Sequence, residues 1–349
     1  MGNFTQRNKK NAQKISNSQK ISRFQNEFLQ FIKQDERCRT MQFNKNNSIF
    51  IASCGDLVKV FYFKYGALSF LQQMKHNQLS VTFLSFVRNS QYFMSCCDQQ
   101  IKFWSINGIN NQKFITKVYQ NERHYSCFAI SDKNQLVVAG IENRIQFLYE
   151  DNQWKVYQYI ENHNDWIYNL SFNESENILI SFGGDYKISI MQKFNRFWKI
   201  IQIINVDGFG NQATFIGDDT FIFHPWCSKY MFQYILKQEN NQIFCLSNKI
   251  LMDGEGDLCN LCFSQYIMYG LQKYQQQIQL KQSQKRLLIK QDMNSILIFQ
   301  VIENQELQFQ QSLIFQSIQI QASMSNDGKY LITWDESSRN IQVISIEYH

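Results

Sequence analysis

Proline is nearly absent from this chain, since Pro225 is the only one among 349 residues. Asn, Asp and Gly must therefore form most of the turns. There is no run of about 18 apolar residues, which predicts that no segment spans a membrane. The chain also lacks an N-terminal secretory signal, and its nine cysteines are an odd number. Both features indicate free thiols in a reducing compartment, either cytoplasmic or nuclear.

Motifs for nucleotide, metal or hydrolytic chemistry are missing as well. Neither GxxxxGK[ST] nor GxGxxG occurs, and no Gly-x-Ser-x-Gly is present. The two cysteines Cys259 and Cys262 form a lone CxxC, whereas a structural zinc site commonly draws its four ligands from two such pairs. These absences predict a protein with no cofactor, no metal, no small-molecule substrate and no catalytic activity.

Aromatic residues are abundant, with 30 Phe and 17 Tyr, and they favour strands together with the many Ile and Val residues. The net charge of +6 is mildly basic and does not by itself indicate nucleic-acid binding. The composition therefore predicts an all-β protein.

A strand pattern recurs along the chain at a nearly constant spacing. Each unit has an apolar second strand that ends in small residues, then a polar turn and a third strand. Equivalent third-strand residues lie 43 or 44 positions apart, which is the period of four-stranded propeller blades. These positions are Phe61, Trp104, Leu148, Met191 and Tyr234, and they are followed by the third strands Ser295–Val301 and Asn340–Ile346. The pattern predicts seven units.

The units resemble WD40 repeats, and the resemblance covers roughly residues 25–349. Residues 163–172 look like the Gly-His dipeptide and the alternating strand of that family, with Asn162 in place of the usual Gly. The Trp-Asp signature is degenerate, since Trp104 is followed by Ser105. The resemblance implies an all-β, seven-bladed WD40-type β-propeller.

The two ends of the chain complement each other. Residues 28–33 match residues 70–75, the expected outer strand of the first blade, at four of six positions. The last blade lacks an outer strand, because the chain ends after the third strand at 341–346. In the resembled family the N-terminus supplies that strand, so we expect residues 28–33 to complete the last blade. A helix is the alternative, because apolar residues from Ile21 to Phe31 have helical spacing.

Two sets of polar residues match the family's structural hydrogen-bond chain, which links a blade-connecting loop to the second strand and the following turn. The sets are His163, Ser181 and Asp185, and His76, Ser95, Asp98 and Trp104. The first set has the residue types of a hydrolase triad, but the sequence lacks a nucleophile turn and an oxyanion hole. We therefore interpret both sets as structural.

Two basic segments depart from a plain propeller. Residues 1–24 contain six Lys or Arg and no acid, which predicts a disordered tail. A basic, Gln-rich insertion at about 271–294 is expected between the second and third strands of the sixth blade. That position would place it on the face with the blade-connecting loops, opposite the chain ends.

Candidate partner-binding residues come from this insertion and from aromatic residues at the blade-connecting loops and turns. They are Lys273, Lys281, Lys285, Arg286, Lys290, Tyr125, Trp166 and Tyr186. These residues predict a non-enzymatic scaffold that binds protein partners as a subunit of a larger complex. The alternative is an RNA- or ribonucleoprotein-associated propeller that binds through its basic tail and insertion.

Overall fold

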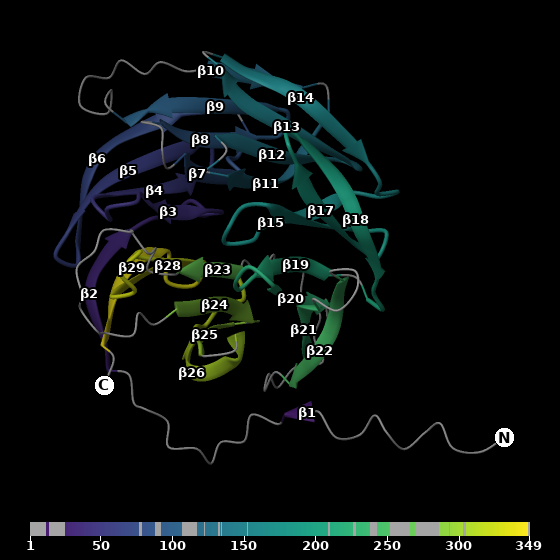
Figure 1. Ribbon diagram of the computed structural model, residues 1–349. Helices are drawn as coiled ribbons and strands as arrows, with labels where there is room; N and C mark the ends of the chain where they lie inside the picture. The colour runs from purple at the N-terminus through teal and green to yellow at the C-terminus, as the bar shows by residue number, and fades with distance from the viewer. Residues whose placement is uncertain are drawn as a thin grey trace, which may run out of the picture.

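The strands form seven sheets around a ring (Figure 1). This computed structural model describes residues 12–13, 25–76, 79–87, 92–106, 117–121, 123–131, 133, 135–151, 153–208, 210–225, 228–237, 243–251, 266–269, 286–292, 294–302 and 305–347. Within these residues, no helix is long and apolar enough to cross a membrane.

Each blade is an antiparallel sheet of four strands, ordered from the first strand to the outermost one. Blade 1 contains β3 (Met41–Phe43), β4 (Ile49–Cys54), β5 (Leu57–Lys64) and β6 (Ala67–Lys75). Blade 2 contains β7 (Phe83–Val87), β8 (Tyr92–Cys97), β9 (Gln100–Ser105) and β10 (Lys117–Gln120). Blade 3 contains β11 (Tyr125–Ser131), β12 (Leu136–Ile141), β13 (Arg144–Asp151) and β14 (Gln153–Glu161). Blade 4 contains β15 (Ile167–Phe172), β16 (Ile178–Gly183), β17 (Lys187–Phe194) and β18 (Phe197–Asn205).

The remaining three blades follow the same order. Blade 5 contains β19 (Gly210–Phe215), β20 (Thr220–Pro225), β21 (Tyr230–Lys237) and β22 (Ile243–Leu251), and β1 (Ala12–Gln13) pairs with β22 in parallel. Blade 6 contains β23 (Tyr266–Tyr269), β24 (Arg286–Asp292), β25 (Ser295–Val301) and β26 (Leu307–Ile314). Blade 7 contains β27 (Ile320–Met324), β28 (Tyr330–Asp335), β29 (Asn340–Glu347) and β2 (Gln25–Lys33).

Because neighbouring strands are antiparallel, the turns alternate between the two faces of the ring. The connections between blades and the turns between second and third strands lie on one face, which we call the upper face. The turns between first and second strands and between third and outermost strands lie on the other, the lower face. The start of β2 and the end of β29 are therefore on the lower face.

The apolar core lies between blades rather than within one sheet. Every side chain of β12 and of β16 is buried, because both faces of a middle strand are covered by neighbouring blades. Trp104 of blade 2, for example, packs against Val58 and Val60 of blade 1. This arrangement explains why the second strands are nearly continuous apolar runs.

The N-terminal strand closes the ring, as the sequence predicted. Strand β2 pairs antiparallel with β29 from Gln25 opposite Glu347 to Lys33 opposite Asn340. The helical alternative for residues 28–31 is therefore wrong. An outer strand gains the ladder hydrogen bonds of β29, which a helix could not form.

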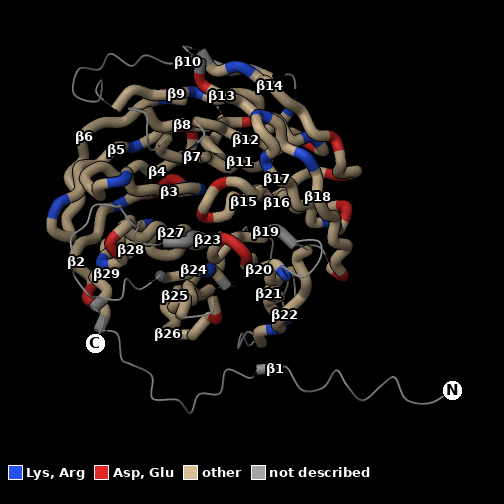
Figure 2. Tube along the Cα trace, in the orientation of Figure 1, with Lys and Arg blue, Asp and Glu red and all other residues tan. Residues whose placement is uncertain are grey.

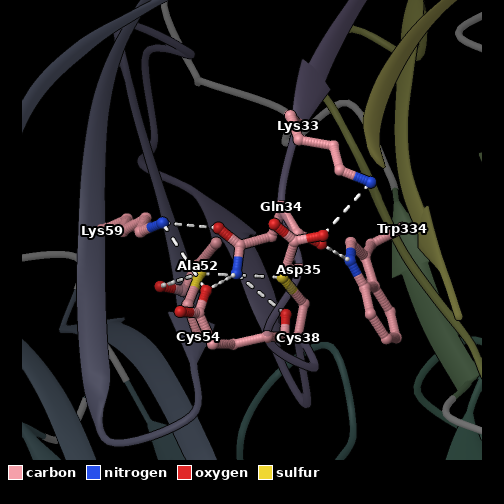
Figure 3. Close-up of polar contacts among 9 residues, drawn as sticks. Lys33, Gln34, Asp35, Cys38, Ala52, Cys54, Lys59 and Trp334 are labelled. Atoms are coloured by element: carbon pink, nitrogen blue, oxygen red, sulfur yellow. Dashed lines mark hydrogen bonds and ion pairs between the residues drawn. The ribbon is translucent and has the colours of Figure 1, made fainter. Parts of the chain in front are cut away.

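Gln34, directly after β2, ties the last blade to the first (Figure 3). Its side chain is buried, and its Oε1 accepts a hydrogen bond from Lys59 Nζ at 2.6 Å. Its backbone carbonyl accepts one from Trp334 Nε1 at 3.0 Å. The closure thus depends on side-chain contacts to both blades as well as on the β2–β29 ladder.

A glutamine on the outer strand clamps several neighbouring blades together. The amide of Gln202 in blade 4 donates to the Phe244 carbonyl and accepts from the Phe244 amide of blade 5, both at 2.8 Å. Gln158 binds the backbone of Trp198 in the same two-bond manner, and Gln30 binds that of Leu68. Each glutamine follows a one-residue bulge in its strand.

Replacing Gln202 with Ala should lower the free energy of unfolding by about 1–3 kcal/mol, because the backbone groups of Phe244 would lose their partners. Chemical denaturation with urea measures this change. The control is Gln73→Ala, an exposed glutamine on β6, which should change the value by less than about 0.5 kcal/mol. Equal effects of the two substitutions would contradict the clamp.

The expected position of the insertion in blade 6 is wrong. Residues 286–292 form β24, the second strand, and the intervening segment 270–285 connects β23 to β24. A connection between first and second strands lies on the lower face, so it is on the same face as the start of β2. The lone CxxC at 259–262, expected in the first strand of blade 6, lies outside the described residues, and β23 is that first strand.

Candidate functional site

A hydrogen-bonded chain fixes the loop that leads into blade 4 on the upper face. His163 Nε2 lies 2.8 Å from Ser181 Oγ on β16, and His163 Nδ1 lies 2.9 Å from Asp185 Oδ1 in the following turn. The Asn164 amide donates to Asp185 Oδ2 at 3.0 Å. The structure thus brings together the first set of residues identified in the sequence.

The charge states in this chain follow from its geometry. Burial lowers the pKa of His163, although Asp185 acts in the opposite direction. A neutral His163 then donates from Nδ1 to Asp185 and accepts the Ser181 hydroxyl proton at Nε2. Burial acts to raise the pKa of Asp185, but the hydrogen bonds from His163 and Asn164 outweigh it, so that pKa lies below its usual value.

The glycines Gly183 and Gly184 make room for this chain. A Cβ on Gly183 would lie 2.5 Å from His163 Nδ1, and a Cβ on Gly184 would lie 2.7 Å from Asp165 Oδ2. The Gly184 amide also donates to the Trp166 carbonyl at 2.8 Å. Residues 163–166 are therefore held against β16 and its turn.

The second set of residues, in blade 2, is joined differently. Trp104 Nε1 donates to Ser95 Oγ at 2.6 Å, but His76 Nε2 lies 3.4 Å from the Ser95 carbonyl rather than from its hydroxyl. Asp98 does not complete a chain with His76, because its carboxylate hydrogen-bonds His124 Nδ1 of the next blade-connecting loop. Asp98 therefore links blade 2 to blade 3.

His76 predicts a loss of stability in mild acid. Burial lowers the pKa of His76 to about 4, and Lys102 acts in the same direction. The unfolded chain binds the proton at a pKa of about 6.5, so stability falls as the pH drops below that value and levels off below the folded-state pKa. Between pH 7.5 and 5, the free energy of unfolding should fall by about 2 kcal/mol through this group.

Urea denaturation at both pH values measures this fall, and His76→Gln should reduce it by about 2 kcal/mol. The exposed His124 provides the control, since His124→Gln should leave the pH dependence of the wild type in place. The assignment to His76 is wrong if both variants retain the same pH dependence.

Exposed aromatic rings gather beside the fixed loop. Trp166 is 40% exposed and Tyr186, in the turn after β16, is 49% exposed. The His124 ring stacks on Trp166 with 6.3 Å between centroids. Three rings from two neighbouring blades thus form one surface, which we call the aromatic surface (His124, Trp166 and Tyr186).

Charged groups border the aromatic surface. Arg123 Nη1 lies 3.2 Å from Glu142 Oε2, and Asp98 holds His124. Asp165 Oδ1 accepts the Trp166 amide at 2.7 Å. An apolar ring platform with a charged border is the usual form of a protein-binding hot spot.

Two of the expected partner-binding residues are not at the surface. Tyr125 is 7% exposed, because it begins β11 and its ring packs 5.3 Å from that of Phe128. Lys290 is 1% exposed, because it lies in the middle strand β24 between blades. Neither can contact a partner of the folded ring, so the expectation is wrong for both residues.

The remaining basic candidates belong to blade 6. Arg286 begins β24, opposite Val301. Lys273, Lys281 and Lys285 lie outside the described residues. Sequence reasoning missed His124, although a histidine directly before a strand-starting aromatic residue, in a blade-connecting loop, was a visible signal.

The geometry does not support hydrolysis at His163, Ser181 and Asp185. Ser181 is completely buried and His163 is nearly so, so a substrate cannot reach the hydroxyl. Among the described residues, no three His, Cys, Asp or Glu side chains are placed to hold a metal ion. The polar chain therefore fixes a loop and presents no reactive group.

Seven four-stranded blades, closed by a strand from the N-terminus, define a β-propeller. Residues 68–105 match the family model for the WD domain, G-beta repeat, and they contain the second set of polar residues with its retained Trp104. The chain is a WD40-repeat β-propeller with degenerate repeats. The search of curated proteins finds no match to it. The sequence pattern had instead favoured residues 163–172 as the best repeat.

Proposed function

We propose that this protein is a non-enzymatic scaffold that binds protein partners through the aromatic surface, as a subunit of a larger complex. Propellers of the WD40 family typically serve as interaction scaffolds, and a rigid ring with a variable face suits that role. The observation that carries the proposal is the fixed loop 163–166. It presents Trp166 in one orientation, so little side-chain entropy is lost on binding.

The proposal is tested by affinity purification of the full chain followed by mass spectrometry. Recovery of partners should fall about tenfold or more in a Trp166→Ala, Tyr186→Ala double variant, because truncation of a central aromatic commonly costs that much. The matched control is Tyr65→Ala, which removes an 86% exposed aromatic ring from the lower face. If both variants recover the same partners as the wild type, the aromatic surface is not the binding site.

Binding of RNA is a second candidate, favoured by one topological observation. The connection between β23 and β24 and the start of β2 both lie on the lower face, so the two basic segments of the sequence leave the ring on the same side. Two such segments could contact one RNA together. Phosphate contacts would make that binding strongly salt-dependent.

A further inference from the structure

The hairpin of β17 and β18 carries an exposed apolar strip at the outer rim of blade 4. We call residues 187–205 the blade-4 hairpin. Phe194 and Phe197, which flank its turn, are 45% and 56% exposed. Ile200, Ile201 and Ile203 follow on β18 and are 38%, 38% and 48% exposed. Single exposed apolar residues are ordinary, but a contiguous strip of five marks an interaction site.

The outer strand of the neighbouring blade shows that such a strip is not a requirement of the fold. Among the described side chains of β14, Tyr159 is the one large apolar group that is strongly exposed. Tyr159 also has a structural role, since its hydroxyl accepts a hydrogen bond from Gln146 Nε2 at 3.0 Å. The ring is thus built in blade 3 without an apolar outer strip.

Positive charge is interleaved with the strip. No Asp or Glu occurs from residue 186 to residue 206. Arg196 and Lys199 are exposed, and Lys199 Nζ lies 5.8 Å from the centre of the Phe194 ring. Lys193 precedes the first of the two phenylalanines. Figure 2 shows blue segments along this hairpin, so its apolar strip has a cationic border.

A strand from another protein is a poor fit to this edge. Ile201 is an extra residue in β18, since Gln202 pairs with Ile190 and Ile200 with Met191. A bulge interrupts the row of backbone groups that an added strand would need. The exposed rings instead surround a hairpin turn that projects from the rim, which is a convex shape.

We propose that the blade-4 hairpin docks the protein on the surface of an anionic lipid bilayer. Aromatic rings favour the headgroup region of a bilayer, where Phe194 and Phe197 would be buried. The long cationic side chains of Arg196 and Lys199 keep their charge at the level of the lipid phosphates. Each basic residue near an anionic leaflet adds a favourable electrostatic contribution.

The geometry lets membrane docking and partner binding coexist. The turn at residues 195–196 joins a third strand to an outermost strand, so it lies on the lower face. The aromatic surface lies on the upper face and remains free when the hairpin is docked. The inference therefore goes beyond the scaffold function and does not depend on it.

Co-sedimentation of the full chain with lipid vesicles tests the proposal. The wild type should bind vesicles of phosphatidylcholine that contain phosphatidylserine, and should bind pure phosphatidylcholine vesicles much less. A Phe194→Ser, Phe197→Ser variant and an Arg196→Glu, Lys199→Glu variant should each lose about tenfold in apparent affinity. Both should keep the melting temperature of the wild type, because these side chains are exposed.

The matched control is Ile314→Ser, which removes a 77% exposed apolar side chain from the end of β26. This variant should bind like the wild type. The proposal is overturned if either hairpin variant binds phosphatidylserine vesicles as the wild type does, or if Ile314→Ser loses as much. It is also overturned if the serine variant binds normally and only abolishes self-association in sedimentation velocity, which would make the hairpin an interface between copies.

Discussion

Removal of residues 1–34 should lower the melting temperature of the ring by about 10 °C or more. The truncation removes β2 and leaves the backbone of β29 without its outer partner. It also removes Gln34, so the buried Trp334 Nε1 loses its acceptor, at a cost of about 1–3 kcal/mol. Loss of the Gln30 clamp to Leu68 separates blade 7 from blade 1 at the rim.

The matched truncation removes residues 1–24 and keeps β2. It should change the melting temperature by less than about 3 °C, because the closing ladder begins at Gln25. Far-ultraviolet circular dichroism follows both transitions. If the two truncated chains melt together, β2 does not close the ring.

Deletion of residues 272–290 should unfold blade 6, whereas deletion of residues 272–284 should be tolerated. The longer deletion removes most of β24, including Leu288 and Ile289, which are buried among neighbouring strands. Loss of several buried aliphatic side chains costs about 2–5 kcal/mol each. The shorter deletion stays within the connection between β23 and β24 and leaves both strands intact.

Limited proteolysis and thermal melts distinguish the two chains, since only the longer deletion should yield a protease-sensitive ring. The shorter deletion also tests the RNA hypothesis. If the basic segment binds RNA, RNA co-purification at low salt should fall about fivefold or more in that variant. A strong loss of stability in the shorter deletion would contradict the placement of β24.

The sequence allowed most of the ring to be predicted, because its third strands recur at one spacing and its two ends complement each other. Blade 6 was misassigned because Lys290 stands in its second strand where Ser95 and Ser181 stand in blades 2 and 4. A charged residue at that position hid the strand. The available signal was the distance to the third strand, since Lys290 precedes Phe299 as Ser95 precedes Trp104.

The candidate site was less predictable, because exposure depends on what a neighbouring blade supplies. Tyr125 and Trp166 both lie at strand starts, but Tyr125 packs against Phe128 while Trp166 stays open beside His124. The clamping glutamines were visible as residues after an apolar pair, as in Gln30 and Gln202. Their role required the distance to the next blade, which periodicity alone does not contain.

The pairing of Gln25 with Glu347 has a consequence for the connectivity of the ring. In each of the other blades, the third strand turns back into the outermost strand of the same sheet; in blade 7, the two chain ends meet at that point instead. A short designed loop between them would make the backbone circular. New termini could then be opened within residues 272–284, and the resulting circular permutant would have its seam in blade 6 with every strand retained.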